Sequence, residues 1–221
     1  MRQFLPLFRK IKIIEYPEKD LRLNYLAHAY LSFNDPQILV GNLISDFVKG
    51  KKKFDYSKEI QKGISLHRSI DQFTDKHPVT LQAKLLFKPA YGLYASAFMD
   101  VSYDHFLATD RNVFPEEHDL ASFSKRTYGL LTPFHSIFPE KFRGMFHFMQ
   151  SQDWLYNYRL KEGIYRSFRG LVHRASFIHE HESACRVLDD HYSELRNFYN
   201  AFFPDLKNFS YTVFQKLLEQ E

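Results

Sequence analysis

Apolar residues recur at helical spacing along most of the chain, whereas the two-residue alternation typical of strands is scarce. The pattern predicts an all-α fold, a single compact multi-helix bundle formed by residues 23–221 after an N-terminal extension at residues 1–22. The predicted helices are 24–31, 36–49, 58–77, 80–87, 91–109, 120–131, 141–150, 154–160, 162–174, 180–203 and a short last helix that ends at Glu221.

Turn and capping residues indicate where several helices begin and end. Asp35 followed by Pro36 is typical of a helix start, with Asp35 as the N-cap and Pro36 at the first helical position. Ser57 is a second candidate cap, and Gly50 ends the preceding helix. Pro204 predicts a break before the last helix, because proline lacks the N–H that continues the helical hydrogen-bond pattern.

The segment from Gly63 to Asp71 contains a candidate metal-binding pair. His67 and Asp71 stand one turn apart on the same helix face, so an imidazole and a carboxylate can share one cation. Arg68, about 100° further round the helix, can reach a metal-bound phosphate oxygen. The alternative is an ordinary side-chain hydrogen bond between His67 and Asp71, which is the commoner role of such a pair taken alone.

Three further segments place polar residues at a similar spacing among apolar neighbours. A buried carboxylate is costly without a partner, so a set of such segments indicates that several helices converge on a polar centre. The absence of thiolates and the mixture of imidazole and carboxylate favour Mn²⁺, Mg²⁺, Fe or Zn²⁺ over copper. The three segments carry Asn24 and His28, then Asn42 and Asp46, and then Asp100, Asp104 and His105.

Several sharper motifs are missing from the sequence. The run from His179 to Glu182 has the wrong spacing for a zincin motif and is predicted to be a solvated segment. The chain contains neither a Walker-type phosphate loop nor a glycine-rich dinucleotide fingerprint, and it has no Glu-x-x-His pair of the ferritin-like di-iron type. These absences leave the converging polar pairs as the main indication of function.

Composition and charge narrow the setting of the protein. Aromatic residues make up 17% of the 221 residues, which predicts helices packed around bulky side chains rather than disorder. The formal net charge of +4 suits an acidic macromolecule or a phosphorylated substrate and is too mild to indicate nucleic acid. Cys185 is the only cysteine, and no run has the length of a signal peptide core or a membrane span. The expectation is a soluble, cytoplasmic protein without a membrane partner.

The order of the motifs resembles the acyl carrier protein phosphodiesterases, over roughly Leu23 to the C-terminus. The resemblance rests on Asn24-Tyr-Leu-Ala-His28, Gly41-Asn42-Leu-Ile-Ser-Asp46-Phe-Val-Lys-Gly50, Gly63-Ile-Ser-Leu-His67-Arg68-Ser-Ile-Asp71, Asp100-Val-Ser-Tyr-Asp104-His105-Phe-Leu, Trp154-Leu-Tyr-Asn-Tyr158 and Gly163-Ile164. It implies a helical fold distantly similar to HD-domain phosphohydrolases, dependence on Mn²⁺, and removal of 4′-phosphopantetheine from holo acyl carrier protein. It also implies a place in lipid metabolism, in fatty acid biosynthesis. Asp104-His105 stands where an HD domain has a His-Asp doublet, so the ligand assignments of HD domains are not transferred.

On this reading the candidate residues have different expected roles. The metal-facing group is Asp46, His67, Asp71 and Asp104, with His28 and His105 as further ligands or proton-transfer residues. Arg68 and Lys49 are expected to bind phosphate, and Asn24 and Asn42 to orient ligands or water. Nearby lysines could steer an acidic carrier protein or simply form a solvated loop: Lys49, Lys51, Lys52, Lys53, Lys58 and Lys62.

Two other functions stay open at this stage. One is an HD-like metal phosphohydrolase that acts on a nucleotide or another small phosphodiester. The other is a non-catalytic helical binding module for an acidic partner; nucleic acid is not expected, because the interleaved basic and aromatic motifs of known modules are missing. The sequence leaves the number of metal ions and the oligomeric state undetermined.

Overall fold

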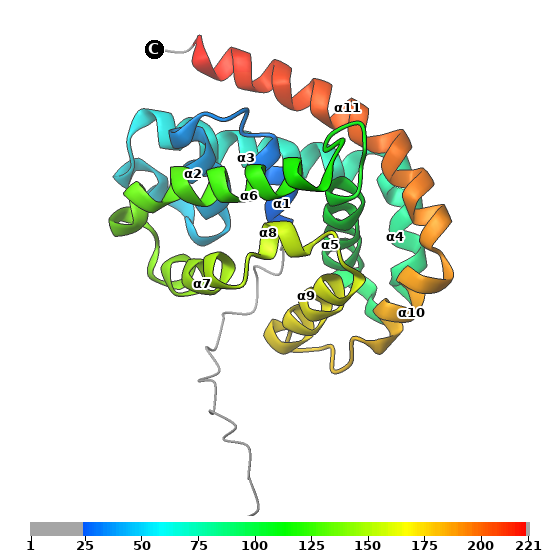
Figure 1. The fold of residues 1–221 in the computed structure, drawn as a ribbon. Helices are drawn as coiled ribbons and strands as arrows, with labels where there is room; N and C mark the ends of the chain where they lie inside the picture. Colours follow the sequence, from blue (N-terminus) through cyan, green and yellow to red (C-terminus); the bar gives the residue numbers. More distant parts are fainter. Residues whose placement is uncertain (1–23, 220–221) are drawn as a thin grey trace, which may run out of the picture.

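The computed structural model describes residues 24–219, and every regular element in that range is helical (Figure 1), which confirms the predicted all-α class. The predicted extension at residues 1–22 lies outside the described residues, and the similarity to HD domains stays a prediction. The α-helices are α1 Tyr25–Tyr30, α2 Pro36–Ile44, α3 Lys58–Lys76, α4 Pro78–Tyr91, α5 Ala95–Ala108, α6 Glu117–Leu131, α7 Glu140–Ser151, α8 Trp154–Asn157, α9 Lys161–Arg174, α10 Glu182–Asp190 and α11 Tyr192–Leu218. The 3₁₀ helices are η1 Ser45–Phe47, η2 Gly50–Asp55, η3 Gly92–Tyr94 and η4 Thr132–Ile137.

Helix α5 is the central element of the fold. Almost every one of its side chains is buried, and it packs against α1, α4, α9 and α11. Aromatic rings fill the space around it; Phe98, for example, stacks on Tyr91 with ring centroids 3.9 Å apart. Because α5 contacts helices on several sides, it links α1, which carries His28, to α9 and α11 in the C-terminal half of the chain.

The crossing of α2 and α3 brings the two backbones into direct contact at a pair of glycines. A Cβ atom added to Gly63 would lie 2.3 Å from the carbonyl oxygen of Ile38 and 2.9 Å from Cα of Gly41. A Cβ added to Gly41 would lie 2.0 Å from the carbonyl oxygen of Ile60. Only glycine fits at these two positions, and the close crossing sets the distance between Asn42 on α2 and His67 on α3.

The segment after α2 differs from the prediction. The helix was expected to continue to Lys49, but the α-helix ends at Ile44 and a 3₁₀ turn, η1, follows. Val48 is extended, with φ −109° and ψ 98°, and Gly50 adopts a positive φ of 56°. This change of direction ends the α-helix early and places Asp46 on a short turn instead of on the face of α2.

The helix break near the C-terminus lies at His191, so the prediction of a break at Pro204 was wrong. At His191 φ is −111° and ψ is 22°, which separates α10 from α11. Pro204 lies inside α11 on its exposed side, while Phe202, Phe203 and Leu206 are buried on the other side. The burial of these side chains offsets the one hydrogen bond that proline removes.

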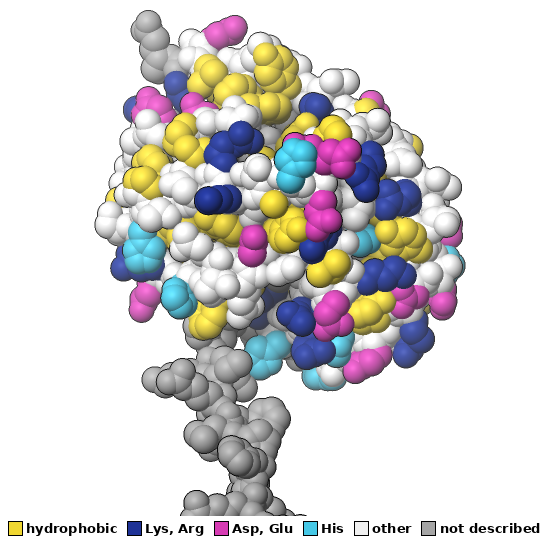
Figure 2. Space-filling view, in the orientation of Figure 1, with side chains coloured by type: hydrophobic (Ala, Val, Ile, Leu, Met, Phe, Trp, Pro, Cys, Tyr) yellow, Lys and Arg dark blue, Asp and Glu magenta, His cyan; other side chains and the backbone are white. Residues whose placement is uncertain are grey.

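The surface carries a mixture of charges. On the face drawn in Figure 2, Lys and Arg alternate with Asp and Glu and with separate hydrophobic side chains, so no single charge sign dominates that face. Among the described residues, no helix combines the length and the apolar character that a membrane crossing needs.

Candidate metal centre

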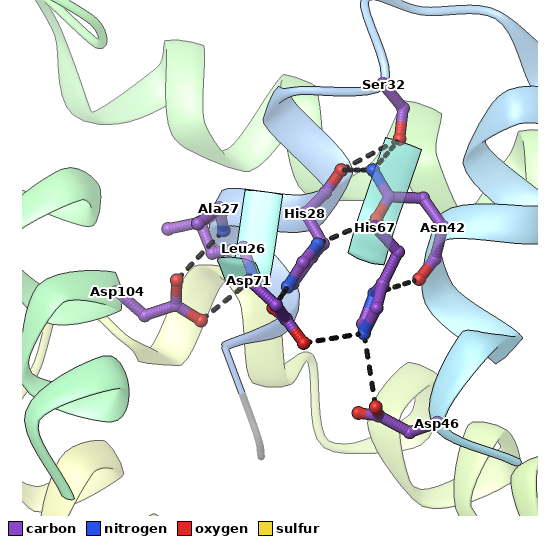
Figure 3. Close-up of polar contacts among 9 residues, drawn as sticks. All are labelled: Leu26, Ala27, His28, Ser32, Asn42, Asp46, His67, Asp71 and Asp104. Carbon is purple, nitrogen blue, oxygen red and sulfur yellow. Dashed lines mark hydrogen bonds and ion pairs between the residues drawn. The ribbon is translucent and has the colours of Figure 1, made fainter. Parts of the chain in front are cut away.

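Four of the predicted site residues meet between α1, η1 and α3 (Figure 3). Nε2 of His67 lies 3.1 Å from Oδ1 of Asp46 and 3.3 Å from Oδ2 of Asp71. Nε2 of His28 lies 3.3 Å from Oδ1 of Asp71. Candidate ligand atoms of His28, His67 and Asp71 all lie within 4.8 Å of one another, which is close enough for one cation to be shared. Asp46 flanks this group through its contact with His67.

Asn42 fixes the orientation of both imidazoles. Its side-chain Oδ1 lies 2.7 Å from Nδ1 of His28, and its main-chain oxygen lies 2.7 Å from Nδ1 of His67. The Asn42 amide nitrogen donates to the carbonyl oxygen of His28 at 2.9 Å and to Oγ of Ser32 at 3.0 Å, so Oδ1 is the acceptor that faces His28. Each Nδ1 therefore carries its proton toward Asn42, and each Nε2 points at the carboxylates.

This arrangement fits a metal ligand set. Metal-binding histidines generally donate their other ring nitrogen to a carbonyl or carboxylate oxygen, which fixes the tautomer and the ring orientation. The rings of His28 and His67 also stack, with centroids 4.1 Å apart and an angle of 18° between the planes, so the two Nε2 atoms emerge on the same side. Two imidazoles and up to two carboxylates are ligands that Mn²⁺, Fe and Zn²⁺ accept.

Electrostatics keep the carboxylates of the centre ionised. Burial opposes ionisation of Asp71, but the neighbouring His67 and His28 lower the pKa of its carboxyl group far below the ordinary value. Burial also acts on Asp46, and His67 again outweighs it and lowers the pKa. Burial favours the neutral ring of His67, yet Asp46 and Asp71 together raise its pKa to about 10. Burial and the charge of His67 lower the pKa of His28. The centre thus offers negative charge to a cation.

Asp104 and His105 are not brought into this cluster. The two carboxylate oxygens of Asp104 accept the backbone N–H groups of Leu26 and Ala27, each at 2.9 Å, at the first turn of α1. Burial raises the pKa of Asp104 well above its ordinary value, although these two N–H groups act in the opposite direction. Helix α1 has no side-chain cap from Asn24, and Asp104 supplies that function from α5.

His105 and Asn24 also lie outside this cluster, in contacts between helices. Nδ1 of His105 lies 2.8 Å from the carbonyl oxygen of Tyr158, and its Nε2 lies 2.9 Å from the hydroxyl of Tyr192. Asn24 is buried at the start of α1, beside Asp100 and Tyr103 in a small internal cavity. The hydrogen bonds of His105 join α5 to the segment around α8 and to α11.

The cationic candidates lie beside the centre, at its exposed side. Arg68 is exposed on α3 and donates from Nη2 to the carbonyl oxygen of Val48 at 3.3 Å, which holds it over the η1 turn that carries Asp46. Lys49, the residue after Val48, is exposed. The lysine-rich turn, η2 with Lys51, Lys52 and Lys53, comes next, and Phe54 within it is 63% exposed.

Ser32 is a member of the site that the sequence analysis did not single out. Its hydroxyl donates to the carbonyl oxygen of His28 at 2.8 Å and accepts from the Asn42 amide. The available signal was its position four residues after His28, on the same side of the helical turn. Serine at that spacing is common without any function, so the contact with Asn42 was needed to identify it.

We expect Asn42→Ala to lower the free energy of unfolding by about 2–3 kcal/mol, because it leaves the buried polar groups of His28 and Ser32 without their hydrogen-bond partner. The loss of orientation at His28 should also weaken divalent-metal affinity by roughly 10- to 100-fold. Urea unfolding and metal titration measure the two effects. Ser32→Ala is the control, with a smaller effect on both, and equal metal affinity in Asn42→Ala and the unmodified protein would contradict the orienting role.

An all-helical fold with a centre of two buried histidines and two half-buried aspartates is a scaffold suited to metal-assisted hydrolysis. The model of the acyl carrier protein phosphodiesterase family matches residues 23–206, and the chain belongs to this family. This confirms the resemblance seen in the sequence motifs.

Curated relatives with the name acyl carrier protein phosphodiesterase cover most of the chain. One from Photorhabdus laumondii subsp. laumondii is 30% identical over 182 residues, which is 82% of this chain and 92% of the relative. One from Klebsiella pneumoniae subsp. pneumoniae is 30% identical over 184 residues, 83% of this chain and 95% of the relative. One from Yersinia enterocolitica is 29% identical over 182 residues, 82% of this chain and 94% of the relative. No solved structure matches the chain.

Proposed function

We propose that this protein is a metal-dependent phosphoric diester hydrolase that cleaves the bond between 4′-phosphopantetheine and the serine of holo acyl carrier protein, giving apo carrier protein. The observation that carries the proposal is the group formed by His28, His67 and Asp71, with ligand atoms within 4.8 Å of one another, in a chain that belongs to the acyl carrier protein phosphodiesterase family. We also assign the reaction to the cytoplasm, since a chain with Cys185 as its only cysteine forms no intrachain disulfide.

In this proposal His28, His67 and Asp71 hold a divalent cation, and Asp46 is the fourth candidate ligand. Mn²⁺ is our first choice, with Mg²⁺ or Fe as alternatives, because the donors are imidazole nitrogens and carboxylate oxygens. When bound, such a cation lowers the pKa of a water molecule and offsets charge on the phosphoryl oxygens.

The remaining roles belong to side chains around the centre. Asn42 keeps both Nδ1 atoms protonated and so directs both Nε2 atoms at the centre. Arg68, held against Val48, has a guanidinium whose other N–H groups can donate to the non-bridging oxygens of a phosphodiester. Lys49 adds positive charge on the same exposed side. We leave Asp104, His105 and Asn24 out of the catalytic set because their polar groups serve the packing of α1 and α5.

The test is mass spectrometry of holo acyl carrier protein incubated with this protein and Mn²⁺, beside an EDTA control. The proposal expects a metal-dependent decrease to the mass of the apo carrier protein. If a folded, metal-loaded sample leaves the carrier protein unchanged but hydrolyses a small phosphodiester, the substrate assignment is wrong and the metal centre stands. If the protein binds no metal and hydrolyses neither, the function is non-catalytic.

The lysine-rich turn η2 is our candidate docking surface for the carrier protein, which is an acidic partner. We expect the double variant Lys51→Glu/Lys52→Glu to raise KM for holo carrier protein about 10-fold at low ionic strength, since surface attractions of ~0.2–1 kcal/mol each are lost and replaced by repulsion. The difference should shrink with added salt because surface charges are screened.

The matched control for the lysine-rich turn is Lys88→Glu/Lys216→Glu, which makes the same change in net charge at exposed positions of α4 and α11. This control should leave KM within about twofold if docking depends on the lysines of η2 and not on the net charge of the protein. Equal effects of both double variants would show that only net charge matters and would remove η2 as the docking surface.

A further inference from the structure

A pocket of about 280 Å³ lies between α8 and α9, outside the metal centre. Its walls combine apolar and polar groups, including Trp154, Asn157, Tyr158, Ser167, Gly170 and Arg174. Pockets that bind small molecules typically have this composition, with mostly apolar walls and a few polar groups that fix orientation. None of the roles proposed above uses this pocket.

The polar groups on the walls suit a chain that contains amides. The Asn157 amide nitrogen donates to the carbonyl oxygen of Gln152 at 2.6 Å, which directs its Oδ1 elsewhere as an acceptor. The Ser167 hydroxyl donates to the carbonyl oxygen of Gly163 at 3.1 Å and keeps lone pairs as acceptors. The guanidinium of Arg174, also on the wall, is a donor for carbonyl oxygens. Both halves of an amide group thus find complementary partners.

The apolar part of the pocket suits methyl and methylene groups. Trp154 and Leu160 contribute hydrophobic side chains, and Gly163 and Gly170 keep the α9 wall free of bulk. At Gly163 the backbone lies so close to α8 that an added Cβ would be 2.2 Å from the carbonyl oxygen of Asn157. Gly163 and Asn157 both line the pocket.

The pocket is connected to the metal centre by a short series of contacts. Tyr158 lines the pocket, and its carbonyl oxygen contacts Nδ1 of His105 on α5. The adjacent Asp104 holds the N–H groups of Leu26 and Ala27, and the next residue of α1 is His28. The pocket and the centre are therefore linked through α5 and the first turn of α1.

We infer that the α8–α9 pocket binds the pantetheine arm of the substrate while its phosphodiester lies at the metal centre. This rests on the proposed function. The arm carries two amides, a hydroxyl and geminal methyl groups, which correspond to the donors, acceptors and apolar walls of the pocket. The pocket would then distinguish phosphopantetheine diesters from other phosphodiesters.

Trp154 allows a direct test, because it is the only tryptophan of the chain and it lines the pocket. Titration of the metal-free protein with 4′-phosphopantetheine and with pantetheine should change its fluorescence in a saturable manner. Ser167→Leu and Gly170→Leu place bulk in the pocket, since the Cβ at Gly170 points toward Nη1 of Arg174 at 3.4 Å. Both variants should weaken the response at least 10-fold.

The matched control is Gly129→Leu, a glycine on α6 around which an added Cβ meets no atom within 4 Å. This control should retain the fluorescence response, and all three variants should keep the increase in melting temperature that Mn²⁺ produces. With holo carrier protein, the pocket variants should lose at least 10-fold in kcat/KM, and Gly129→Leu should stay within twofold.

The outcomes separate the pocket from the proposed function. If the protein converts holo carrier protein but the pocket variants are as active as Gly129→Leu, the pocket assignment is wrong. If neither the unmodified protein nor any variant converts holo carrier protein, the proposed function is wrong, and the fluorescence titration alone tests the pocket assignment. A saturable response that Ser167→Leu abolishes supports the pocket assignment. The absence of a response with the unmodified protein overturns it.

Discussion

Asp71→Asn should lower metal-dependent hydrolysis of holo acyl carrier protein by about 10²- to 10³-fold, the scale of removing one preorganised charged group from an active site. The reason is that Asp71 is the carboxylate that faces both Nε2 atoms, at 3.3 Å from His28 and 3.3 Å from His67. The substitution keeps the shape of the side chain and removes its negative charge. Steady-state kinetics with saturating Mn²⁺ measures the effect.

Asp75→Asn is the matched control for Asp71→Asn. Asp75 lies one turn further along α3 and pairs with Lys84 at 2.8 Å, away from the histidines. Activity should stay within about twofold, because the ion pair of Asp75 with Lys84 is not part of the metal centre. The melting temperature gives a second readout, because metal at 100 times its Kd stabilises a protein by ~2.7 kcal/mol and so raises its melting temperature. This increase should be lost in Asp71→Asn and kept in Asp75→Asn. A full metal-induced shift in Asp71→Asn would remove this residue from the ligand set.

Gly63→Ala should destabilise the fold by about 3 kcal/mol, the upper end of the usual cost of overpacking. The added methyl group would lie 2.3 Å from the carbonyl oxygen of Ile38, a backbone atom that cannot rotate away. For a chain of this size the loss corresponds to a decrease in melting temperature of roughly 6–12 °C. Thermal unfolding followed by circular dichroism measures it.

Gly129→Ala makes the same chemical change in open surroundings and should have the opposite effect on stability. Nothing lies within 4 Å of the added Cβ, so the better helix propensity of alanine should stabilise the protein by up to ~1 kcal/mol. If Gly63→Ala melted at or above the temperature of the unmodified protein, the close α2–α3 crossing described above would be wrong. Metal binding by Gly63→Ala should also weaken, because the crossing sets the distance between α2 and α3.

The sequence was sufficient to predict the helical class and the contact between His67 and Asp71, because helical spacing places residues four apart on one face. It was not sufficient to predict the contacts of Asp104, which lies four residues after Asp100 on α5, a spacing that metal ligands on a helix also have. Spacing identifies the residues that share a face but not the neighbour that the face contacts, and in this fold the neighbour of Asp104 is the start of α1. The position of Asp46 on a turn could not be predicted from spacing either, since that turn depends on the backbone conformation at Val48 and Gly50.

Pro204 illustrates a different limit. The expected break at this residue rests on a local effect: proline in the interior of a helix costs about 3 kcal/mol or more. The buried side chains of Phe202, Phe203 and Leu206 on the same helix outweigh it through tertiary packing. Such packing depends on elements far away in the chain, so the local sequence could not predict that α11 continues through this residue.

The glycine pair at the α2–α3 crossing affects how the protein can tolerate sequence change. Most helix pairs are separated by side chains, and a substitution there is absorbed by a small shift of one helix. Here the backbones of Gly41 and Gly63 touch, so the separation of α2 and α3 does not depend on the size of the surrounding core residues. Substitutions in the neighbouring core should reduce stability before they alter the distances between Asn42, Asp46 and His67. The apolar interior can therefore diverge widely in sequence while the geometry of the centre is retained.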